Sequence, residues 1–509
     1  MNLLLAEWTK LRSVPRWLIT LFSAALLTVG ISMLGAASSN TDINKHPDFV
    51  TGPNGDPVAD SFSFAHQPVS SDVTMTVRVA SLASTSQQEQ NRGPQSIGKK
   101  VPDTPWTGIA AGIMIKDGTR SGSSYASVLL TAENGVRMQS DFAEDTAGSK
   151  TSGARWLRLT RTGSTITGYE SADGTTWQRI GTMTPKAVPA TAEIGFYLSA
   201  APEVFISRGM GSSSLGTQPI SATATFDDIQ VTSASAAGWH ADAVKMPISD
   251  DFGPAPQGKD GQRAKSAERQ AQPLLTEDSG TYTVTGSGKV GPQAPDDDVV
   301  EAALLGVIAG LMALIAVGVL FATSEYRKGM IRTTFAATPR RGRVLAAKAL
   351  VLGGVTFVLS FAGVVASFLL AIPILKEHGL GPPAFPTPSL SDGAVLRALL
   401  LTALFMTGVA VFALALGTLL RHSAAAITLT IALVVLPVIA GSVLPGTSPR
   451  WLMYTTLAGG LATMRAKPPT ETLAEPWAMI GPWAGLGVVC AYAAIGLGLA
   501  GWRLRRRDA

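Results

Sequence analysis

Residues 325–348, with the sequence EYRKGMIRTTFAATPRRGRVLAAK, follow one long apolar run, 299–322, and lead into a second, 344–375. The stretch carries seven Lys and Arg residues. Lys and Arg are retained on the cytoplasmic side when a chain inserts into a membrane. We therefore predict that this stretch is a cytoplasmic loop, and this assignment sets the direction of every other segment.

The same stretch also places apolar residues at helical spacing, at Tyr326, Met330, Ile331 and Phe335. A loop that only set the orientation of the chain would not need such residues. A mixture of basic and apolar side chains is typical of a helix that lies along a membrane surface. We predict a short helix beneath the membrane that is available to a cytoplasmic partner.

The composition divides the chain of 509 residues into two populations. Residues 38–298 are polar and contain 21 Lys/Arg and 28 Asp/Glu, a net charge of −7. The remaining residues are apolar and contain 20 Lys/Arg and 8 Asp/Glu, a net charge of +12. The basic charge thus lies beside the predicted membrane segments, where insertion and anionic lipid account for it, so we predict no nucleic-acid partner.

Six apolar runs are long enough to cross a bilayer, which takes about 20 residues. They are residues 17–37, 299–322, 344–375, 396–420, 424–443 and 477–501. Fifteen Lys/Arg fall on the predicted inner side and at most five on the outer side. This bias predicts a multi-pass plasma-membrane protein with both termini in the cytoplasm and residues 38–298 outside. We predict that residues 17–37 are an uncleaved anchor, because the run is long for a signal peptide. A cleaved signal peptide is the alternative.

Residues 1–16 are predicted to form an amphipathic entry helix that Pro15 interrupts. Leu4, Trp8 and Leu11 follow i, i+4, i+7 spacing. Such a helix lies in the membrane interface, and its candidate interfacial residues are Glu7, Trp8, Lys10 and Arg12. With the first span, this segment forms the first domain, residues 1–37.

Residues 38–237 are predicted to form an all-β sandwich. Val73, Met75, Val77 and Val79 alternate with other residues, and Ile194, Phe196 and Leu198 repeat the pattern. Turn signals such as Asn134-Gly135 and Asp173-Gly174 separate the runs. Residues 238–298 either complete the sandwich or act as a stalk. Residues 299–509 then hold five spans.

Three segments of the membrane half resemble a known family. Residues 6–17 (AEWTKLRSVPRW), residues 322–350 and the tail RLRRRDA resemble actinobacterial permease subunits of the ABC-2 type exporter family. The resemblance implies a second permease subunit, the same chain or a related one, and a cytoplasmic ABC ATPase that binds ATP and Mg²⁺. It also implies that the loop at 323–345 couples to the ATPase. The matching positions are Glu325, Tyr326, Arg327, Gly329, Arg332, Arg340 and Arg341.

A second resemblance covers part of the polar insert. Residues 156–183 and 223–231 resemble the concanavalin-like, laminin-G-like jelly-roll of glycan-binding and glycosidase accessory domains. It implies a fold and makes cell-wall glycan a candidate partner. Four aromatic residues are candidates to stack on sugar rings, although core packing is the simpler reading of each: Trp106, Trp156, Tyr169 and Trp177.

The chain offers no catalytic, cofactor or metal site that the sequence supports. Residues 93–100 and 286–291 approximate phosphate-binding patterns, but neither is followed by a predicted helix, so ATP hydrolysis is assigned to a partner. The single cysteine, Cys490, excludes an intramolecular disulfide. No E-x-D-x-E strand supplies the paired carboxylates of a jelly-roll glycosidase.

Ionisable residues are absent from the middle of every predicted span. Glu301 and Lys348 fall near span ends, where we expect their side chains to snorkel to the interface. Proton-coupled and ion-coupled carriers usually need a charged group within the membrane. The sequence therefore favours motion that is imposed from outside the membrane. With the ABC-2 resemblance, this implies a permease subunit of an ATP-driven exporter. The alternative is a membrane-anchored glycan-binding or sensory protein.

Overall fold

The computed structural model describes residues 2–39, 50–70, 72–84, 99–100, 106–209, 212–218, 220–232, 238–245, 274–293, 297–327, 341–382, 385–444, 449–470 and 475–506. The chain separates into two compact units. The helical unit comprises Met1–Asn44, Ser207–Ser214 and Asp296–Ala509, and the β unit comprises Lys45–Ile206 and Leu215–Pro295.

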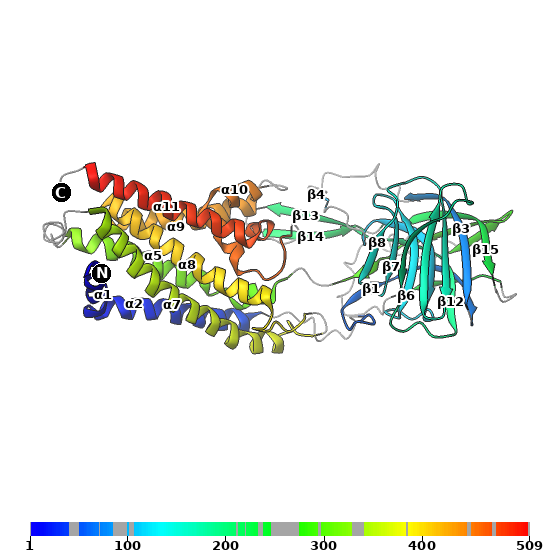
Figure 1. Ribbon diagram of the computed structural model, residues 1–509, viewed down its shortest axis with the longest axis horizontal. Coiled ribbons are helices and arrows are strands. Elements are labelled where there is room, and N and C mark those ends of the chain that lie inside the picture. Colours follow the sequence, from blue (N-terminus) through cyan, green and yellow to red (C-terminus); the bar gives the residue numbers. More distant parts are fainter. Residues whose placement is uncertain are drawn as a thin grey trace, which may run out of the picture. The chain divides into compact units, whose positions relative to one another are not determined.

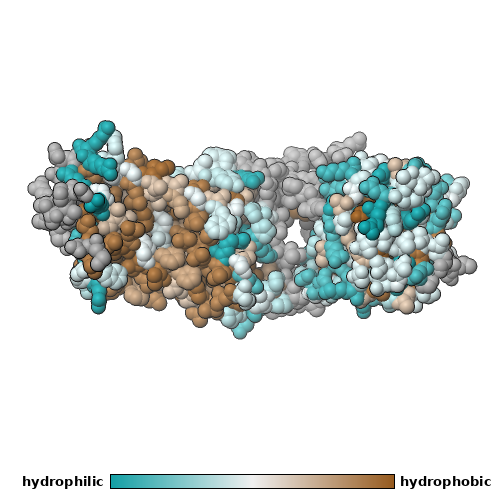
Figure 2. Space-filling view, viewed as in Figure 1, coloured by the Kyte–Doolittle hydropathy of each residue, from teal (hydrophilic) through white to brown (hydrophobic). Residues whose placement is uncertain are grey.

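Six helices of the helical unit are long and apolar enough to cross a membrane, which confirms the predicted number of membrane-length apolar segments (Figure 1). They are α2 (Pro15–Ser38), α5 (Val307–Arg327), α7 (Arg341–Glu377), α8 (Gly393–Leu420), α9 (Ser423–Val443) and α11 (Pro482–Arg506). The shorter helices are α1 (Asn2–Ser13), α4 (Val299–Ala303), α10 (Pro449–Thr455), and the 3-10 helices η3 (Leu457–Met464) and η4 (Pro476–Met479). Figure 2 shows a broad apolar band over the long helices of this unit, as lipid contact requires.

Helix α8 lies at the centre of the helical unit. Its most apolar window is 72% buried, whereas those of α2 and α11 are each 22% buried. Close packing of small residues joins the outer helices to the bundle. A Cβ added to Gly306 would meet the carbonyl oxygen of Thr28 at 1.9 Å, and one on Gly310 would meet the Thr28 hydroxyl at 1.9 Å. The glycine pair at 306 and 310 therefore lets α2 and α5 approach closely.

The structure differs from the predicted spans and loops at three places. The run at 299–322 is broken, because α4 ends at Ala303 and α5 begins at Val307. The last span begins at Pro482, and Trp477 lies in η4 before it. The predicted outer loop after α9 contains η3, all of whose residues are buried. Hydropathy alone does not detect the break before α5, because Leu304 and Leu305 continue the apolar run.

The strands of the chain are β1 (Val58–Asp60), β2 (Phe62–Val69), β3 (Val73–Ser84), β4 (Lys99–Lys100), β5 (Ile109–Lys116), β6 (Tyr125–Thr131), β7 (Gly135–Ser140), β8 (Glu144–Ala147), β9 (Arg155–Thr162), β10 (Thr165–Ser171), β11 (Gln178–Met183), β12 (Ala192–Ala200), β13 (Glu203–Gly209), β14 (Ser212–Gln218), β15 (Ala222–Thr232), β16 (His240–Val244), β17 (Leu275–Asp278), β18 (Thr281–Gly286) and β19 (Val290–Pro292). Two seven-stranded sheets have the orders β11-β10-β9-β3-β15-β18-β17 and β16-β2-β12-β5-β6-β7-β8. The paired strands run antiparallel. The predicted all-β sandwich is confirmed.

The sandwich core lies between the two sheets. The alternating residues of β3 and β12 that the sequence singled out are buried in it, from Val73 to Val79 and from Ile194 to Leu198. Phe196 of β12 packs on Phe226 of β15, with ring centroids 4.9 Å apart. The pairing of β15 with β3 shifts register between Asp227 and Gln230. Asp228 has a φ of 50°, which places the backbone in the left-handed region.

A second apolar cluster covers the outer face of the second sheet. Val58 of β1 and Val290 of β19 are buried in it together with Phe62 and Tyr197. Strands β16, β17 and β18 join the same two sheets. Within residues 238–298, these three strands therefore belong to the sandwich, whereas Asp298 belongs to the helical unit.

Candidate functional site

Four charged residues from three helices meet at the end of the helical unit that holds both chain termini, here called the termini end. Glu7 and Lys10 come from α1, Glu325 from the last turn of α5, and Lys348 from α7. We call these four residues the ion cluster. Between Glu325 and Lys348 runs the predicted cytoplasmic loop, so the cluster joins the two helices that flank this loop.

Each lysine of the ion cluster bridges both glutamates. Lys348 Nζ lies 2.9 Å from Glu7 Oε2 and 2.6 Å from Glu325 Oε1. Lys10 Nζ lies 2.8 Å from Glu7 Oε1 and 3.2 Å from the same Glu325 Oε1. Two positive and two negative groups alternate, so the formal charge of the cluster is zero. Charge balance of this kind is what makes the burial of ions tolerable.

Three members of the cluster are almost fully buried. The exposed fraction is 1% for Glu7, 5% for Glu325 and 4% for Lys348. Lys348 Nζ also lies 5.0 Å from the centroid of the Phe321 ring, which adds a cation–π contact. The expectation that Lys348 snorkels to the interface is therefore wrong. Its amine finds two carboxylates inside the protein, which removes the need to reach water.

Lys10 occupies the solvent edge of the cluster. Burial by itself would lower the pKa of Lys10, but the hydrogen bond to Glu7 and the charge of Glu325 outweigh burial and raise the pKa. Lys10 therefore stays charged throughout the physiological range. The side chain of Lys10 is 38% exposed, so water screens its share of the interaction.

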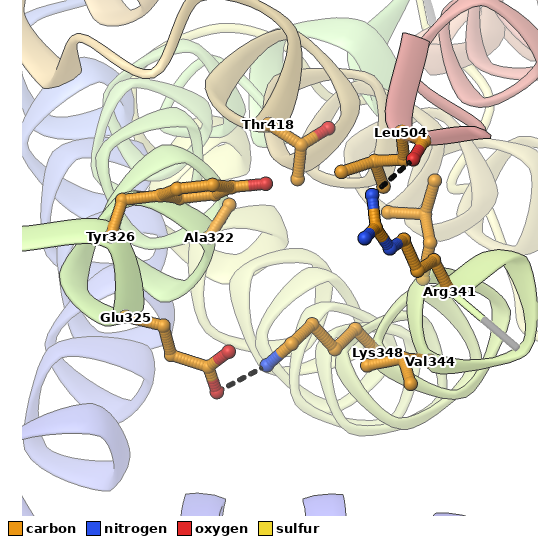
Figure 3. Close-up of a pocket in the computed structure, with 9 residues that line it drawn as sticks. Ala322, Glu325, Tyr326, Arg341, Val344, Lys348, Thr418 and Leu504 are labelled. Carbon is orange, nitrogen blue, oxygen red and sulfur yellow. Dashed lines mark hydrogen bonds and ion pairs between the residues drawn. The ribbon is translucent and has the colours of Figure 1, made fainter. Parts of the chain in front are cut away.

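A small pocket opens beside the ion cluster (Figure 3). Its lining comes from α5, α7, α8 and α11 and consists of Ala322, Glu325, Tyr326, Arg341, Val344, Leu345, Lys348, Thr418 and Leu504. In Figure 3 the Tyr326 ring reaches across the pocket towards Thr418, opposite the Glu325–Lys348 pair. Glu325 Oε2 is buried and has no hydrogen-bond partner among the described residues. The flanks of the loop therefore enclose a small pocket at the termini end, beside the ion cluster.

Arginines fasten the other helices around this pocket. Arg341 Nη1 donates to the carbonyl oxygen of Leu504 at 3.1 Å, which links α7 to α11. Arg503 Nη1 donates to the carbonyl oxygen of Leu419 at 2.7 Å, which links α11 to α8. The Arg421 guanidinium lies 5.2 Å from the centroid of the Tyr326 ring. The start of α7 is thereby connected to every helix that lines the pocket.

The predicted coupling residues are only partly within the described chain. Glu325, Tyr326 and Arg341 lie together at the pocket, and Arg327 ends α5. Gly329, Arg332 and Arg340 lie outside the described residues, as does the short helix predicted beneath the membrane. The coupling residues predicted from the sequence lie on both flanks of the loop. The connection of these flanks through Lys348 and Glu7 was not predicted.

The entry helix uses its residues differently from the predicted pattern. Leu4 and Trp8 are 42% and 44% exposed, whereas Leu11 is fully buried. Glu7 points into the ion cluster, and Arg12 is exposed. Leu4 and Trp8 thus remain available to lipid, while the face with Glu7 and Leu11 packs on the bundle.

Glu301, the other residue expected to snorkel, is also paired inside the protein. Its Oε2 lies 2.8 Å from Nη1 of Arg465, a residue that is 1% exposed. This expectation is wrong for the same reason as for Lys348. The surroundings of Glu301 lie at the opposite end of the helical unit, where the chain enters and leaves the β unit; this is here called the insert end.

The candidate sugar-stacking aromatics of the β unit fall into two groups. Arginine guanidinium groups lie over two of the rings. Arg78 lies 4.8 Å from the centroid of the Trp156 ring, and Arg158 lies 3.7 Å from that of Trp177. Tyr169 pairs across strands with Arg158. Trp106 instead lines a shallow pocket on the outer face of the second sheet, with Thr107, Gly108, Ala110, Leu129, Gln139, Tyr197, Ser199, Ala201, Lys289 and Val290.

Possible metal ligands and the two glycine patterns are the remaining features of the sequence to be located. Within it, no group of three or more His, Cys, Asp or Glu side chains is arranged to hold a metal ion. The glycine pattern at 286–291 runs from β18 into β19, and no helix follows it directly. The pattern at 93–100 lies mostly outside the described residues.

Comparison with known proteins assigns no family. No family model and no curated protein matches the chain. Among solved structures, one match is the crystal structure of a functionally unknown protein from Saccharomyces cerevisiae, with 17% sequence identity. The match covers 33% of this chain and 74% of the yeast chain, with a TM-score of 0.18. So slight a similarity carries no argument, and the resemblance to ABC-2 permeases stays a prediction.

Proposed function

We propose that this chain is the permease subunit of an ATP-driven ABC-type exporter, coupled to a separate cytoplasmic ATPase. One observation carries the proposal: the buried ion cluster joins both flanks of the predicted cytoplasmic loop to α1. A loop that served only as a connection would not need its two flanking helices bridged by a buried lysine. The resemblance of residues 6–17 and 322–350 to ABC-2 permeases points the same way.

The ion cluster offers a physical route for coupling. A force on the loop acts first on the last turn of α5 and the first turns of α7. Because Lys348 holds Glu325 and Glu7 at 2.6 and 2.9 Å, these ends and α1 move as one body. Arg341 passes the displacement to α11 through the Leu504 carbonyl. Discrete contacts of this kind transmit motion between packed helices.

The proposed orientation follows the charge bias of the sequence. The termini end faces the cytoplasm and the ATPase, and residues 38–298 lie outside the cell. A second permease subunit, this chain or a related one, completes the transporter. The apolar band of the helical unit in Figure 2 supports membrane embedding.

Charge reversal in the loop tests the coupling role. The full chain is co-purified from its native cell in mild detergent, and ATP hydrolysis of the purified complex is measured. With Arg340→Glu and Arg341→Glu we expect the ATPase to be lost while the chain still inserts. Arg505→Glu with Arg506→Glu is the matched control, because both arginines are exposed at the same end. An ATPase retained equally by both double variants would exclude this role of the loop.

A second candidate function is glycan binding by the β unit, the role that its resemblance to jelly-roll domains implies. The shallow pocket at Trp106 favours this candidate, because it combines aromatic and polar groups, Gln139, Ser199 and Lys289 among them. Aromatic rings beside hydrogen-bonding groups are the usual means of holding a small polar ligand. The Trp106 ring packs against Gly291, so one edge of the ring is fixed in place.

Binding of cell-wall glycan fragments to the full chain in nanodiscs distinguishes this candidate. If the pocket binds glycan, Trp106→Ala abolishes binding, whereas Trp177→Ala, away from the pocket, leaves it unchanged. Equal binding by both variants, or none by the unaltered chain, rejects the pocket as a glycan site.

A further inference from the structure

The insert end of the helical unit contains a polar junction that the proposed function does not use. Helix α4 begins shortly after β19, where the chain returns from the β unit. Asp298 is the N-cap of α4, and its Oδ1 accepts hydrogen bonds from the N–H groups of Val300 and Glu301 at 3.0 and 3.3 Å. Its Oδ2 accepts from Ala466 N and Lys467 N, both at 2.7 Å. One buried carboxylate therefore fixes α4 to the segment after η3.

Glu301 makes a second connection one turn further along. Its Oε2 pairs with Arg465 Nη1 at 2.8 Å, and its Oε1 accepts from Trp477 Nε1 at 2.5 Å. Arg465 directly follows η3, and Trp477 lies within η4. The contacts of Asp298 and Glu301 thus hold α4, the end of η3 and η4 together. We call Asp298, Glu301, Arg465 and Trp477 the α4 latch.

The charges at the α4 latch are not balanced as they are in the ion cluster. Two other acidic groups, Asp298 and Glu475, act on Glu301. Arg465 is the cation that pairs with Glu301. Arg397, from the second turn of α8, donates to the carbonyl oxygen of Ala466 at 2.8 Å, so it braces the segment instead of pairing with an acid. Lys467 contributes its N–H to Asp298, and its amine lies 5.9 Å from the Phe385 ring.

Burial dominates the titration of Glu301. It raises the pKa of Glu301 to about 7, against the opposing effects of the Arg465 charge and the Trp477 hydrogen bond. Glu475 and Asp298 raise the pKa further through their negative charges. The carboxyl group of Glu301 therefore gains and loses its proton close to neutral pH.

We propose that the α4 latch is a pH-sensitive joint that opens as the pH rises. When closed, it fixes α4, where the chain returns from the β unit, to the buried η3 segment. This inference does not depend on the transport role, because it concerns contacts within the helical unit alone. It does require that the latch have an open state in which Glu301 meets water.

The direction of the pH effect follows from proton linkage. In the closed latch the pKa of Glu301 is about 7, and in water it is near the ordinary value of 4.5. Between these two values the closed state binds more protons than the open state, so acid favours closure. Stability of the closed latch is greatest below the ordinary pKa and is lost as the pH rises through 7. The ion pair with Arg465 alone would give the opposite sign, but it is outweighed by burial.

Hydrogen exchange of the full chain in nanodiscs tests the proposal. The amides of Ala466 and Lys467, which donate to Asp298, report directly on closure. After correction for intrinsic exchange, we expect their protection to fall at least about ten-fold between pH 5.5 and pH 8.5. Glu301→Gln, which mimics the neutral acid, removes this dependence. Asp298→Asn lowers protection at both pH values, because one amide oxygen replaces two carboxylate oxygens.

Three results would overturn the proposal. Protection of Ala466 and Lys467 that does not change with pH in the unaltered chain excludes a pH-sensitive joint. An unchanged pH dependence in Glu301→Gln moves the titration to another group. Full protection in Asp298→Asn excludes the latch itself. Amides in the middle of α7 serve as the internal reference, and none of these readouts involves the ATPase.

Discussion

At the termini end, Glu7, Glu325 and Lys348 pair side chain with side chain, whereas at the insert end Asp298 gives its carboxylate to four main-chain N–H groups. Both arrangements bury charge, but they compensate for it differently. In the ion cluster each anion has two cations within 3.2 Å. In the α4 latch Glu301 has one cation and lies near two further acids.

This difference teaches what each end is suited to do. A balanced cluster of side chains from three helices loses much if any one charge is removed, so it holds helices in a fixed relation. A buried acid with a single cation can instead discharge itself by taking a proton. The termini end is therefore suited to transmitting force, and the insert end to responding to its surroundings.

Removing Lys348 tests the balanced end and gives the largest expected effect. Lys348→Met leaves Glu7 and Glu325 buried with only the half-exposed Lys10 between them. We expect the free energy of unfolding to fall by about 3–5 kcal/mol, the usual cost of breaking a buried pair from one side. Thermal unfolding of the purified chain in detergent measures this.

Two matched variants sharpen the result for Lys348. Lys376→Met removes an exposed lysine from the same helix and should change the unfolding midpoint little. Glu325→Gln added to Lys348→Met restores the charge balance and should recover most of the loss. A single variant as stable as the Lys376 control would show that the ion cluster contributes nothing to stability.

Removing Arg465 is the equivalent change at the insert end, and the expected effect is smaller. In Arg465→Met the Glu301 carboxyl can take a proton, so we expect a loss of about 1–3 kcal/mol near neutral pH. Because the pKa of Glu301 is already raised to about 7, the loss should grow as the pH rises from 6 to 8.

Thermal unfolding at these two pH values measures the Arg465 effect, and Arg450→Met, an exposed arginine in α10, is the control. A loss as large as that of Lys348→Met and independent of pH would remove the distinction between the two ends.

Replacing Asp298 tests the main-chain contacts separately from the titrating group. Asp298→Ala removes the N-cap of α4 and the acceptor of Ala466 N and Lys467 N, and we expect a cost of about 1–2 kcal/mol. Because the Asp298 charge raises the pKa of Glu301, this cost should shrink as the pH rises from 6 to 8, whereas that of Arg465→Met should grow. Asp392, the N-cap of α8, makes no side-chain bond to its helix, so Asp392→Ala should cost less. Equal losses in the two alanine variants would show that the contacts of Asp298 add nothing to stability.

Much of the fold is predictable from the sequence because it depends on local patterns. Long apolar runs predicted the six membrane-length helices, and alternation such as that of Val73 to Val79 predicted the sandwich. The break between α4 and α5 was missed, because Leu304 and Leu305 continue the apolar run. The buried η3 was missed for a similar reason, since it lies in a segment whose prolines are typical of an exposed loop.

The candidate site was only half predictable, because its partners are remote in the sequence. Glu7 and Lys348 are 341 residues apart, and no local pattern connects them. Hydropathy places Lys348 at a span end, where snorkelling is the ordinary expectation for one lysine. Two carboxylates on neighbouring helix ends change that outcome, and this requires knowing which helices pack together.

Replacing Lys10 gives the smallest expected effect and tests the ion cluster from its exposed edge. The side chain of Lys10 is 38% exposed, so water can replace much of what its amine provides to Glu7 and Glu325. We expect Lys10→Met to cost less than about 1 kcal/mol and to become indistinguishable from Arg12→Met at high salt, because screening weakens partly exposed pairs. Thermal unfolding at low and high ionic strength measures both variants. A loss equal to that of Lys348→Met would mean that the four charges act as one unit, so that fixation at the termini end would depend on charge count and not on burial.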